Sequence, residues 1–529
     1  MIEKKPIRLI ELLCIIFLFC CFVLELRCWI YPDIPKELRE GTLIAIASQF
    51  ASGVNPYIMP SNGGMPVFYM YGFMAPFVAG AVSAVTGLSV LITSTICYAV
   101  YKISACILMG ALIYKKHKRW ELALLSASML YACFWRYTVY GGVFPDALGL
   151  FLAMLLYYVF VVGIEKGKQH PVLLAFIVTI MFYTKIYFAF TFLGIAVYFL
   201  VYEKREFLKF MIAGAILCTS SIVVVNLVFP LYFTEAVLYM SGSPDYSILY
   251  SLKQLVALGK LFPLPIVAVA AYVLYRGAGF IKKKISVEHF FGFPLICFFC
   301  MLFVAVYFGR NNGTWLTYFL QLLVPALIML FCEAYVFGTD NFTGSKSNHP
   351  LLKGIGTDGW KGGVFYAILA ILLLVPMVPY SLNRSLDDSQ LSEWEKLYNE
   401  MDTIRECRPS DDVLILGSPF AFYCIRNGLN TIDAGECQYI NNKVMDKWNN
   451  DKQLQLIFPY AKDIYDCFQN ETHSVRNKIL NAEAEYIIID DEIYEYDMDG
   501  DILSSYDLCG VYPIMVGSFE REIKIYRLH

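Results

Sequence analysis

Two carboxylates beside apolar stretches are the first candidates for chemistry. Glu40 opens an amphipathic segment, and Asp146 follows Pro145 in a turn before an apolar run. Ionised side chains avoid hydrocarbon, so a carboxylate at such a position needs a partner or a function. Near a hydroxyl group it can act as a general base, which contributes about 10² to 10⁴-fold to a rate. The alternatives are an ordinary helix cap for Asp146 and a solvated charge for Glu40.

Four cations lie within, or at the ends of, the same apolar stretches. Lys185, Arg136 and Arg310 lie near span ends. Arg binds phosphate through a planar fork and Lys as a point charge, so these side chains are candidates for holding a phosphate. The alternative is that each one only snorkels to the membrane interface. Lys102 lies in mid-span, where a cation needs a cavity or a partner, and we expect it to point into the bundle.

The composition is that of a membrane protein. The chain has 529 residues, of which 58% are hydrophobic and 16% charged, and its mean hydropathy is +0.55. A soluble domain is much less apolar. The net charge of −3 provides no basic field for nucleic acid, so we expect no nucleic-acid partner. The 16 cysteines lack the paired spacing of zinc sites.

The apolar stretches predict an all-α bundle of about eleven membrane-spanning helices. Clusters of Lys and Arg near membrane ends favour the cytoplasmic side. If every cluster is cytoplasmic, the chain must cross the membrane an even number of times between consecutive clusters. This topology places the N-terminus inside and the tail outside. A crossing at 66–87 would reverse every later loop, so this stretch and Arg39 to Gly53 are expected to be interfacial. The spans are predicted at 9–30, 91–114, 120–139, 147–164, 171–185, 187–202, 210–230, 264–281, 289–308, 315–336 and 363–382.

Two domains are therefore predicted, a transmembrane domain over 1–384 and a small extracytoplasmic α/β domain over 385–529. The first contains a large, structured outer loop at 31–90 and a second outer loop at 231–263. In the tail, residues 391–407 fit a helix. Val413 to Leu416 and Tyr486 to Ile489 fit strands, and Glu522 to Tyr526 an edge strand.

Several short motifs resemble those of the GT-C superfamily of polytopic membrane glycosyltransferases. The likeness is to the bacterial type related to the lipid A aminoarabinose transferase and the protein O-mannosyltransferase-like group. It covers about residues 9 to 335. The matching segments are Arg39-Glu40-Gly41 followed by Asn55-Pro56-Tyr57, a Pro- and Tyr-containing stretch ending at Thr86-Gly87, the Phe-Pro-Asp turn at Asp146, Thr184-Lys185, and Gly313 to Tyr318.

The resemblance implies transfer of a hexosyl or pentosyl group, with inversion, from a polyprenyl-phosphate sugar to a glycan, lipid or protein acceptor. Glu40 would be the general base, and Asp146, the second catalytic carboxylate, would orient the acceptor or the cations. No cofactor is required, although paired acids are compatible with a divalent metal. The donor phosphate would lie against Lys185, Arg310, Lys102 and Arg136, and other substrate contacts would come from Arg39, Tyr57 and Tyr69.

Three other classes fit parts of the pattern. A transporter or flippase of lipid-linked saccharides would share the helices and outer cations, but should show internal repeats with broken helices, which the sequence lacks. An envelope polysaccharide polymerase or ligase would be expected to carry an Arg-rich outer loop late in the bundle. The only basic residues in the outer loop 231–263 are Lys253 and Lys260. A purely structural membrane protein leaves the charges on one face unexplained. The expected location is a bacterial plasma membrane, because no eukaryotic retention signal follows Arg527.

Overall fold

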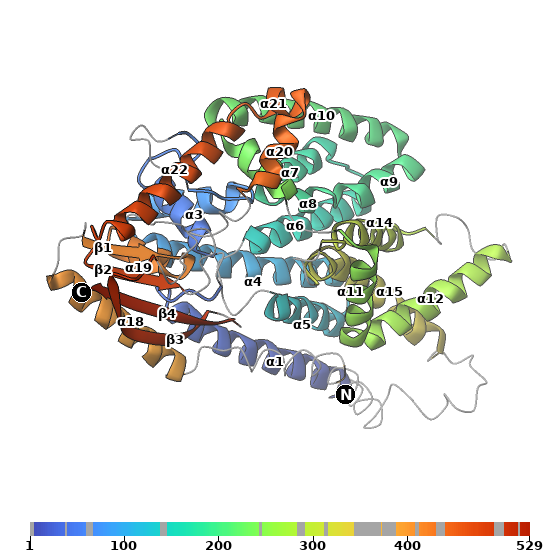
Figure 1. Cartoon of the computed structure of the whole chain (residues 1–529). Coiled ribbons are helices and arrows are strands. Elements are labelled where there is room, and N and C mark those ends of the chain that lie inside the picture. Colours follow the sequence, from blue (N-terminus) through green and yellow to red (C-terminus); the bar gives the residue numbers. More distant parts are fainter. Residues whose placement is uncertain are drawn as a thin grey trace.

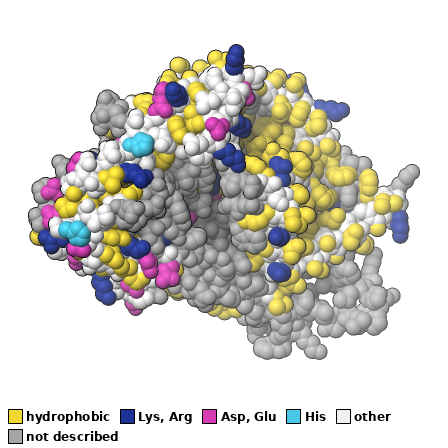
Figure 2. Space-filling view, viewed as in Figure 1, with side chains coloured by type: hydrophobic (Ala, Val, Ile, Leu, Met, Phe, Trp, Pro, Cys, Tyr) yellow, Lys and Arg dark blue, Asp and Glu magenta, His cyan; other side chains and the backbone are white. Residues whose placement is uncertain are grey.

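The protein consists of a large helical bundle and a smaller tail built on a β-sheet, shown in the computed structural model of Figure 1. Figure 2 shows hydrophobic side chains gathered over the bundle, whereas charged side chains are interspersed over the tail. The structure describes residues 5–37, 40–59, 67–137, 145–242, 246–282, 291–311, 316–342, 372, 388–407, 412–429, 440–490, 502–516 and 519–529.

Six helices in the described part are long and apolar enough to cross a membrane, which makes the chain a multi-pass membrane protein. The sixth span begins with a π-helical turn, η3 (Phe319–Leu323), that runs into α15 (Val324–Phe342). The other five are α1 (Lys5–Ile30), α4 (Val90–His117), α6 (Pro145–Glu165), α10 (Lys204–Val228) and α12 (Pro263–Ile281).

Shorter apolar helices complete the bundle. They are α5 (Trp120–Tyr137), α7 (Pro171–Thr184), α8 (Ile186–Ala189), α9 (Phe192–Tyr202) and α14 (Phe293–Phe308). Every span predicted between residues 9 and 336 therefore coincides with helix, although 187–202 is divided into α8 and α9. Of the span predicted at 363–382 the structure describes only residue 372, and the domain boundary at 384 lies outside the described residues.

Two short helices occupy the segment between the first two long spans. They are α2 (Glu40–Ala51) and α3 (Met74–Thr86), which pack against each other. At 1.5 Å per residue α3 is roughly 20 Å long, too short to cross the hydrocarbon. The helix occupies only the second half of the stretch 66–87, because residues 67–73 run without helical structure before it.

The predicted loop 231–263 has more structure than the sequence analysis gave it. It contains a π-helical turn, η1 (Thr234–Leu238), a 3₁₀ turn, η2 (Tyr239–Gly242), and a full helix, α11 (Ile248–Leu261). The buried face of α11 includes Ser251 and Gln254. These polar residues interrupt the apolar periodicity that indicates a helix in the sequence, so α11 was not predicted.

The tail places helices around a four-stranded sheet. Its strands are β1 (Val413–Leu416), β2 (Tyr486–Asp490), β3 (Tyr506–Val516) and β4 (Phe519–Leu528), in the order β1-β2-β4-β3. β1 and β2 are parallel, and the other pairs are antiparallel. Its helical elements are α18 (Asp388–Cys407), η6 (Ser418–Phe420), α19 (Ala421–Arg426), α20 (Asn442–Asn449), α21 (Lys452–Ile457) and α22 (Ala461–Leu480).

One strand assignment from the sequence is wrong. Residues 522–526 belong to β4, which lies between β2 and β3 and is not an edge strand. The edge strands are β1 and β3, and the strand pattern of β3 is interrupted by Pro513 and by an irregularity between Leu508 and Gly510.

The tail is attached to the bundle at several points. The Tyr239 hydroxyl, in η2, donates to the Ala461 carbonyl at 2.6 Å. The Tyr398 hydroxyl donates to the carbonyl of Asp33 at 3.0 Å, and Arg426 forms an ion pair with the Asp33 carboxylate at 3.0 Å. One continuous apolar cluster also joins α2, the end of α10 and the helices α20 to α22. The tail is thus held against segments that follow α1 and α10.

An ion pair inside the bundle joins three helices. Lys102, in α4, donates to both carboxylate oxygens of Glu25, in α1, at 2.6 and 2.7 Å. Both side chains are fully buried. The Tyr131 hydroxyl of α5 donates to the same carboxylate, and its ring lies 4.2 Å from the Lys102 ammonium. Lys102 does point into the bundle, as expected for a cation at mid-span.

Removal of one partner of this pair should strongly destabilise the protein. Lys102→Met leaves the Glu25 carboxylate buried without its cation, at a cost of about 3 to 5 kcal/mol. Adding Glu25→Gln removes the unpaired charge and keeps an acceptor for Tyr131, so most of the loss should be recovered. Thermal unfolding in one detergent measures both variants, with the exposed Lys168→Met as control. Equal melting temperatures for the single and double variants would contradict this account.

Candidate active site

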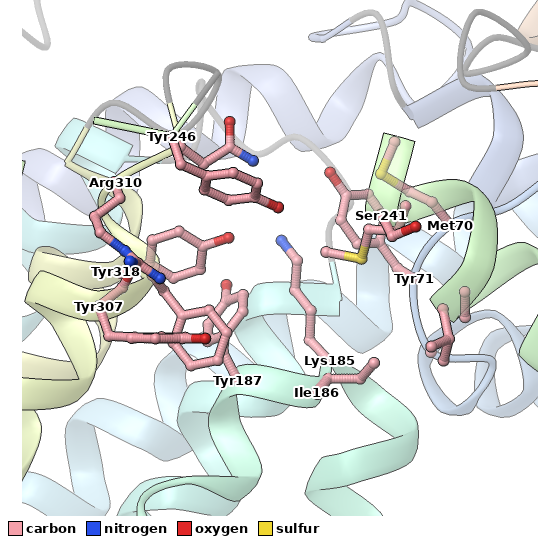
Figure 3. Close-up of a pocket in the computed structure, with 16 residues that line it drawn as sticks. Met70, Tyr71, Lys185, Ile186, Tyr187, Ser241, Tyr246, Tyr307, Arg310 and Tyr318 are labelled. Carbon is pink, nitrogen blue, oxygen red and sulfur yellow. The ribbon is translucent and has the colours of Figure 1, made fainter. Parts of the chain in front are cut away.

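A pocket of about 500 Å³ opens where the start of α8, the end of α14 and the π-helical turn η1 come together. Figure 3 shows the Lys185 side chain pointing into its centre, between Tyr71 on one side and Tyr318 and Tyr246 on the other. Arg310 stands on the wall beside Tyr307. Two cations from distant parts of the chain therefore face one aromatic cavity.

Lys185 is held in place by Asp146. The Lys185 ammonium donates to Oδ1 of Asp146 at 2.9 Å, and both side chains are more than nine-tenths buried. Its nitrogen also lies 4.2 Å from the centre of the Tyr71 ring and 5.3 Å from that of Tyr187. A buried cation needs such neighbours, because desolvation penalises the charged form. The arrangement supplies a fixed positive charge at the pocket.

The same carboxylate oxygen gathers two further donors. The Tyr187 hydroxyl donates to Oδ1 of Asp146 at 2.6 Å, and the Gln321 amide at 2.8 Å. Tyr187 also contacts the amide oxygen of Gln321. Hydrogen bonds to a carboxylate favour its ionised form. One aspartate thus connects the starts of α6 and α8 with the π-helical turn η3.

The local backbone explains why Lys185 leaves the helix. α7 ends at Thr184, Lys185 is extended with φ −164° and ψ 120°, and α8 begins directly after it. Gly72 approaches this break closely, and its N–H donates to the Thr184 carbonyl at 3.2 Å. A Cβ at Gly72 would lie 2.0 Å from the Tyr183 carbonyl oxygen, so only glycine fits. This approach brings Tyr71 against the Lys185 ammonium.

Arg310 is positioned by its neighbours on the opposite wall. Its Nε donates to the Tyr307 carbonyl at 2.8 Å, and the guanidinium lies 4.2 Å from the centre of the Tyr307 ring. The Arg310 carbonyl accepts a hydrogen bond from the Ser247 N–H at 2.9 Å. These contacts leave part of the guanidinium at the surface of the pocket.

A third carboxylate, Glu235, lies in η1, the turn that also supplies Ala236 and Val237 to the pocket. It is fully buried, and Oε2 accepts a hydrogen bond from the Tyr69 N–H at 3.2 Å. Burial raises the pKa of Glu235 well above its ordinary value, and the Tyr69 hydrogen bond opposes this only in part. Glu235 therefore fixes the segment that precedes Tyr71.

Glu40 lies in a different place, at the start of α2. It is fully buried, and Oε2 accepts hydrogen bonds from the backbone N–H groups of Lys36 at 2.6 Å and Glu37 at 2.9 Å. Burial lowers the pKa of Lys36, and the neighbouring Glu40 opposes this. Glu40 is not among the side chains that line the pocket. α2 packs against η6 and α19 of the tail, so Glu40 belongs to the junction of bundle and tail.

The remaining candidates that the structure describes are not brought together with Lys185. Lys102 is paired with Glu25 inside the bundle, so its charge is already neutralised and it does not line the pocket. Tyr57 packs among aromatic rings of one apolar cluster, and the Tyr69 ring lies against Tyr71 behind the pocket wall. Arg136 is in the last turn of α5 but its side chain is outside the described part, as is Arg39 entirely.

Several site residues were missed by the sequence analysis. Tyr187 and Gln321 carry the Asp146 network, and Glu235 supports the wall. Gln321 and Glu235 could have been recognised as site candidates, because each lies in an otherwise apolar run and polar groups at membrane depth need partners. The tyrosines gave no such signal, because tyrosine is common at membrane interfaces. Among the described residues no group of three His, Cys, Asp or Glu side chains could hold a metal ion.

Crystal structures of ArnT share this fold. ArnT from Cupriavidus metallidurans, in a crystal structure bound to undecaprenyl phosphate, aligns with a TM-score of 0.56 at 12% identity over 97% of each chain. The apo structure of ArnT from the same organism gives 0.57 over the same shares. The Archaeoglobus fulgidus oligosaccharyltransferase aligns with a TM-score of 0.47 at 12% identity, over 96% of this chain and 74% of that one. No protein-family model and no curated protein matches the sequence.

The close approach at Gly72 leads to a stability prediction. Gly72→Ala should lower thermal stability by about 1 to 3 kcal/mol, because the added methyl group collides with backbone. Gly214, in α10, has nothing within 4 Å of an added Cβ, so Gly214→Ala is the matched control and should leave the melting temperature unchanged or raise it. A Gly72→Ala protein as stable as the control would contradict the observed packing.

Glu235 should make stability depend on pH. The folded chain keeps a proton on Glu235 at pH values where the unfolded chain has released it, because the folded pKa is the higher one. Stability should therefore fall as pH rises from about 4.5 towards the folded pKa. Glu235→Gln stays neutral and should flatten this fall, whereas the exposed Glu395→Gln should not. Melting temperatures across pH test this, and parallel curves for wild type and Glu235→Gln would refute it.

Proposed function

Because the chain has the fold of the GT-C membrane glycosyltransferases, we propose that it transfers a sugar from a polyprenyl-phosphate donor to an envelope acceptor. The observation that carries the proposal is the pocket in which Lys185 and Arg310 face a cavity lined by tyrosines. ArnT, which shares the fold, has been crystallised with undecaprenyl phosphate. One fold can support many reactions, so the chemistry depends on the residues of the pocket.

The two cations suit the leaving group of such a reaction. When the bond between sugar and phosphate breaks, negative charge grows on the phosphate oxygens, and fixed cations nearby stabilise it. The Lys185 ammonium provides a point charge, and the Arg310 guanidinium provides a fork. Asp146 touches Lys185 directly, and its role in the proposal is to position this cation.

The tyrosine walls suit the rest of the donor. Tyrosine offers an apolar ring face together with a hydroxyl that forms hydrogen bonds, and a sugar presents the same two kinds of surface. Among the described residues, five tyrosines from five separate segments line the pocket: Tyr71, Tyr187, Tyr246, Tyr307 and Tyr318. The polyprenyl chain would extend from the phosphate into the lipid.

Glu40 is the proposed general base. In a single displacement the acceptor hydroxyl attacks the anomeric carbon, its proton passes to a carboxylate, and the configuration at that carbon inverts. Two backbone N–H groups donate hydrogen bonds to the Glu40 carboxylate and hold it in place. Because Glu40 is buried and does not line the pocket, this role requires the carboxylate and the acceptor hydroxyl to come within hydrogen-bonding distance when the substrates bind. No resident cofactor is required for this displacement.

Transfer in proteoliposomes tests the proposal. Labelled polyprenyl-phosphate hexoses and pentoses are supplied to the wild type and to Lys185→Met, Arg310→Met and Glu40→Gln, with and without a chelator. We expect the loss of one phosphate-binding cation to lower the rate about 10² to 10³-fold, and Glu40→Gln to lower it about 10² to 10⁴-fold. The exposed Lys253→Met in α11 is the control and should match wild type.

Other outcomes reject parts of the proposal. If Lys185→Met transfers sugar at the wild-type rate, the pocket does not bind the donor phosphate as proposed. If Glu40→Gln does so, only the assignment of Glu40 as general base is rejected. Movement of labelled lipid between leaflets without transfer would replace the glycosyltransferase by a flippase. Loss of transfer with the chelator would require a metal.

A further inference from the structure

The tail carries an apolar projection on α21 and the residues after it. Leu456 is 82% exposed and Ile457 62%, and Tyr460 follows as a third exposed side chain. The neighbouring Phe458 is buried in the apolar cluster that holds the tail to the bundle. The exposed side chains therefore point away from a segment that is itself fixed.

The fixed side of the projection is well defined. The Asp451 carboxylate accepts hydrogen bonds from the N–H groups of Gln453 at 2.8 Å and Leu454 at 3.3 Å, which caps α21. Trp448 donates to the Phe458 carbonyl at 3.0 Å. These bonds hold the turn in a single shape, so the exposure of Leu456 and Ile457 is not that of a loose end.

The projection adjoins a surface that must face lipid. α10 is 25 residues long and highly apolar, yet only 6% of its span is buried. Leu227, near its end, is 78% exposed. Such a surface is stable only in hydrocarbon. The segment directly after α10 contains Tyr239, whose hydroxyl bonds to the Ala461 carbonyl, close behind α21.

One apolar cluster connects the end of α10 with the region of α21. It contains Val225 and Phe229 from the end of α10 together with Phe458 and Leu454 from the region of α21. In Figure 1, α10 and α21 both lie along the upper edge of the molecule. The lipid-facing surface of α10 and the projection are thus parts of one side of the molecule.

The residues around the projection have the order found at membrane interfaces. Lys452 and Lys462 flank it and are exposed, and Tyr460 lies between its apolar tip and Lys462. Lysines can keep their charge in the headgroup layer while apolar side chains between them enter the acyl region, and tyrosine prefers the boundary.

We propose that Leu456 and Ile457 insert into the lipid leaflet at the Val228 end of α10. The tail would then rest on the membrane through α21 as well as on the bundle, with acyl chains covering the two side chains. The occupant of this apolar surface is lipid, not a second copy of the chain.

The test uses added tryptophans in the full-length protein. Leu456→Trp and Ile457→Trp are placed in nanodiscs that hold one copy, made either of brominated or of ordinary phosphatidylcholine. The emission of the seven native tryptophans is subtracted by measuring wild type in parallel. The matched control is Leu480→Trp, at the far end of α22, where the leucine is 50% exposed. Unchanged elution and melting confirm that each variant folds.

Insertion predicts that bromine reduces the added emission at 456 and 457 by about twofold or more, and that at 480 hardly at all. Equal quenching at the three positions, or none at 456 and 457, would overturn the proposal. Emission shifted to the blue without quenching by bromine would also overturn it, because the side chains would then be covered by protein. The protein can also self-associate in detergent through these two positions and separate in single-copy nanodiscs. In that case, quenching by brominated lipid in the nanodiscs supports lipid as the native cover, and its absence overturns the proposal.

Discussion

A charge at the edge of hydrocarbon must be neutralised where it stands, and the pocket is organised around one such charge. Lys185 is held by Asp146, and the oxygen that binds it also accepts hydrogen bonds from Tyr187 and Gln321. The start of α6, the break between α7 and α8, and the turn η3 are thereby fixed to a single atom. The aromatic walls can keep their positions because the segments beneath them cannot slide independently.

The same constraint has a different solution inside the bundle. The Lys102 ammonium donates short hydrogen bonds to both carboxylate oxygens of Glu25, and neither side chain lines the pocket of Lys185. Lys185 is also paired with a carboxylate, but it keeps a face towards a pocket. The contrast separates a cation that only holds helices together from one that also faces a cavity, although both are buried lysines.

The sequence predicted those features that depend on neighbouring residues. Long apolar runs gave the helices of the bundle, and the position of Asp146 after Pro145 indicated a helix start. Contacts between distant residues could not be read in this way. Nothing near Lys102 in the chain identifies Glu25, 77 residues away, as its partner. Tyr57 and Tyr69 were predicted to contact substrate, and both lie in an apolar cluster, where a tyrosine ring also packs well.

Two π-helical turns flank the pocket: η1, which contains Glu235, and η3, which contains Gln321. A π-helical turn contains one residue more than the α-helical turn it replaces. Removing that residue would rotate all later side chains of the helix by about 100° while leaving the earlier ones unchanged. A single codon gained or lost in either turn would therefore present a new set of side chains to the pocket. Related chains can in this way diverge in what they bind without rebuilding the bundle that supports them.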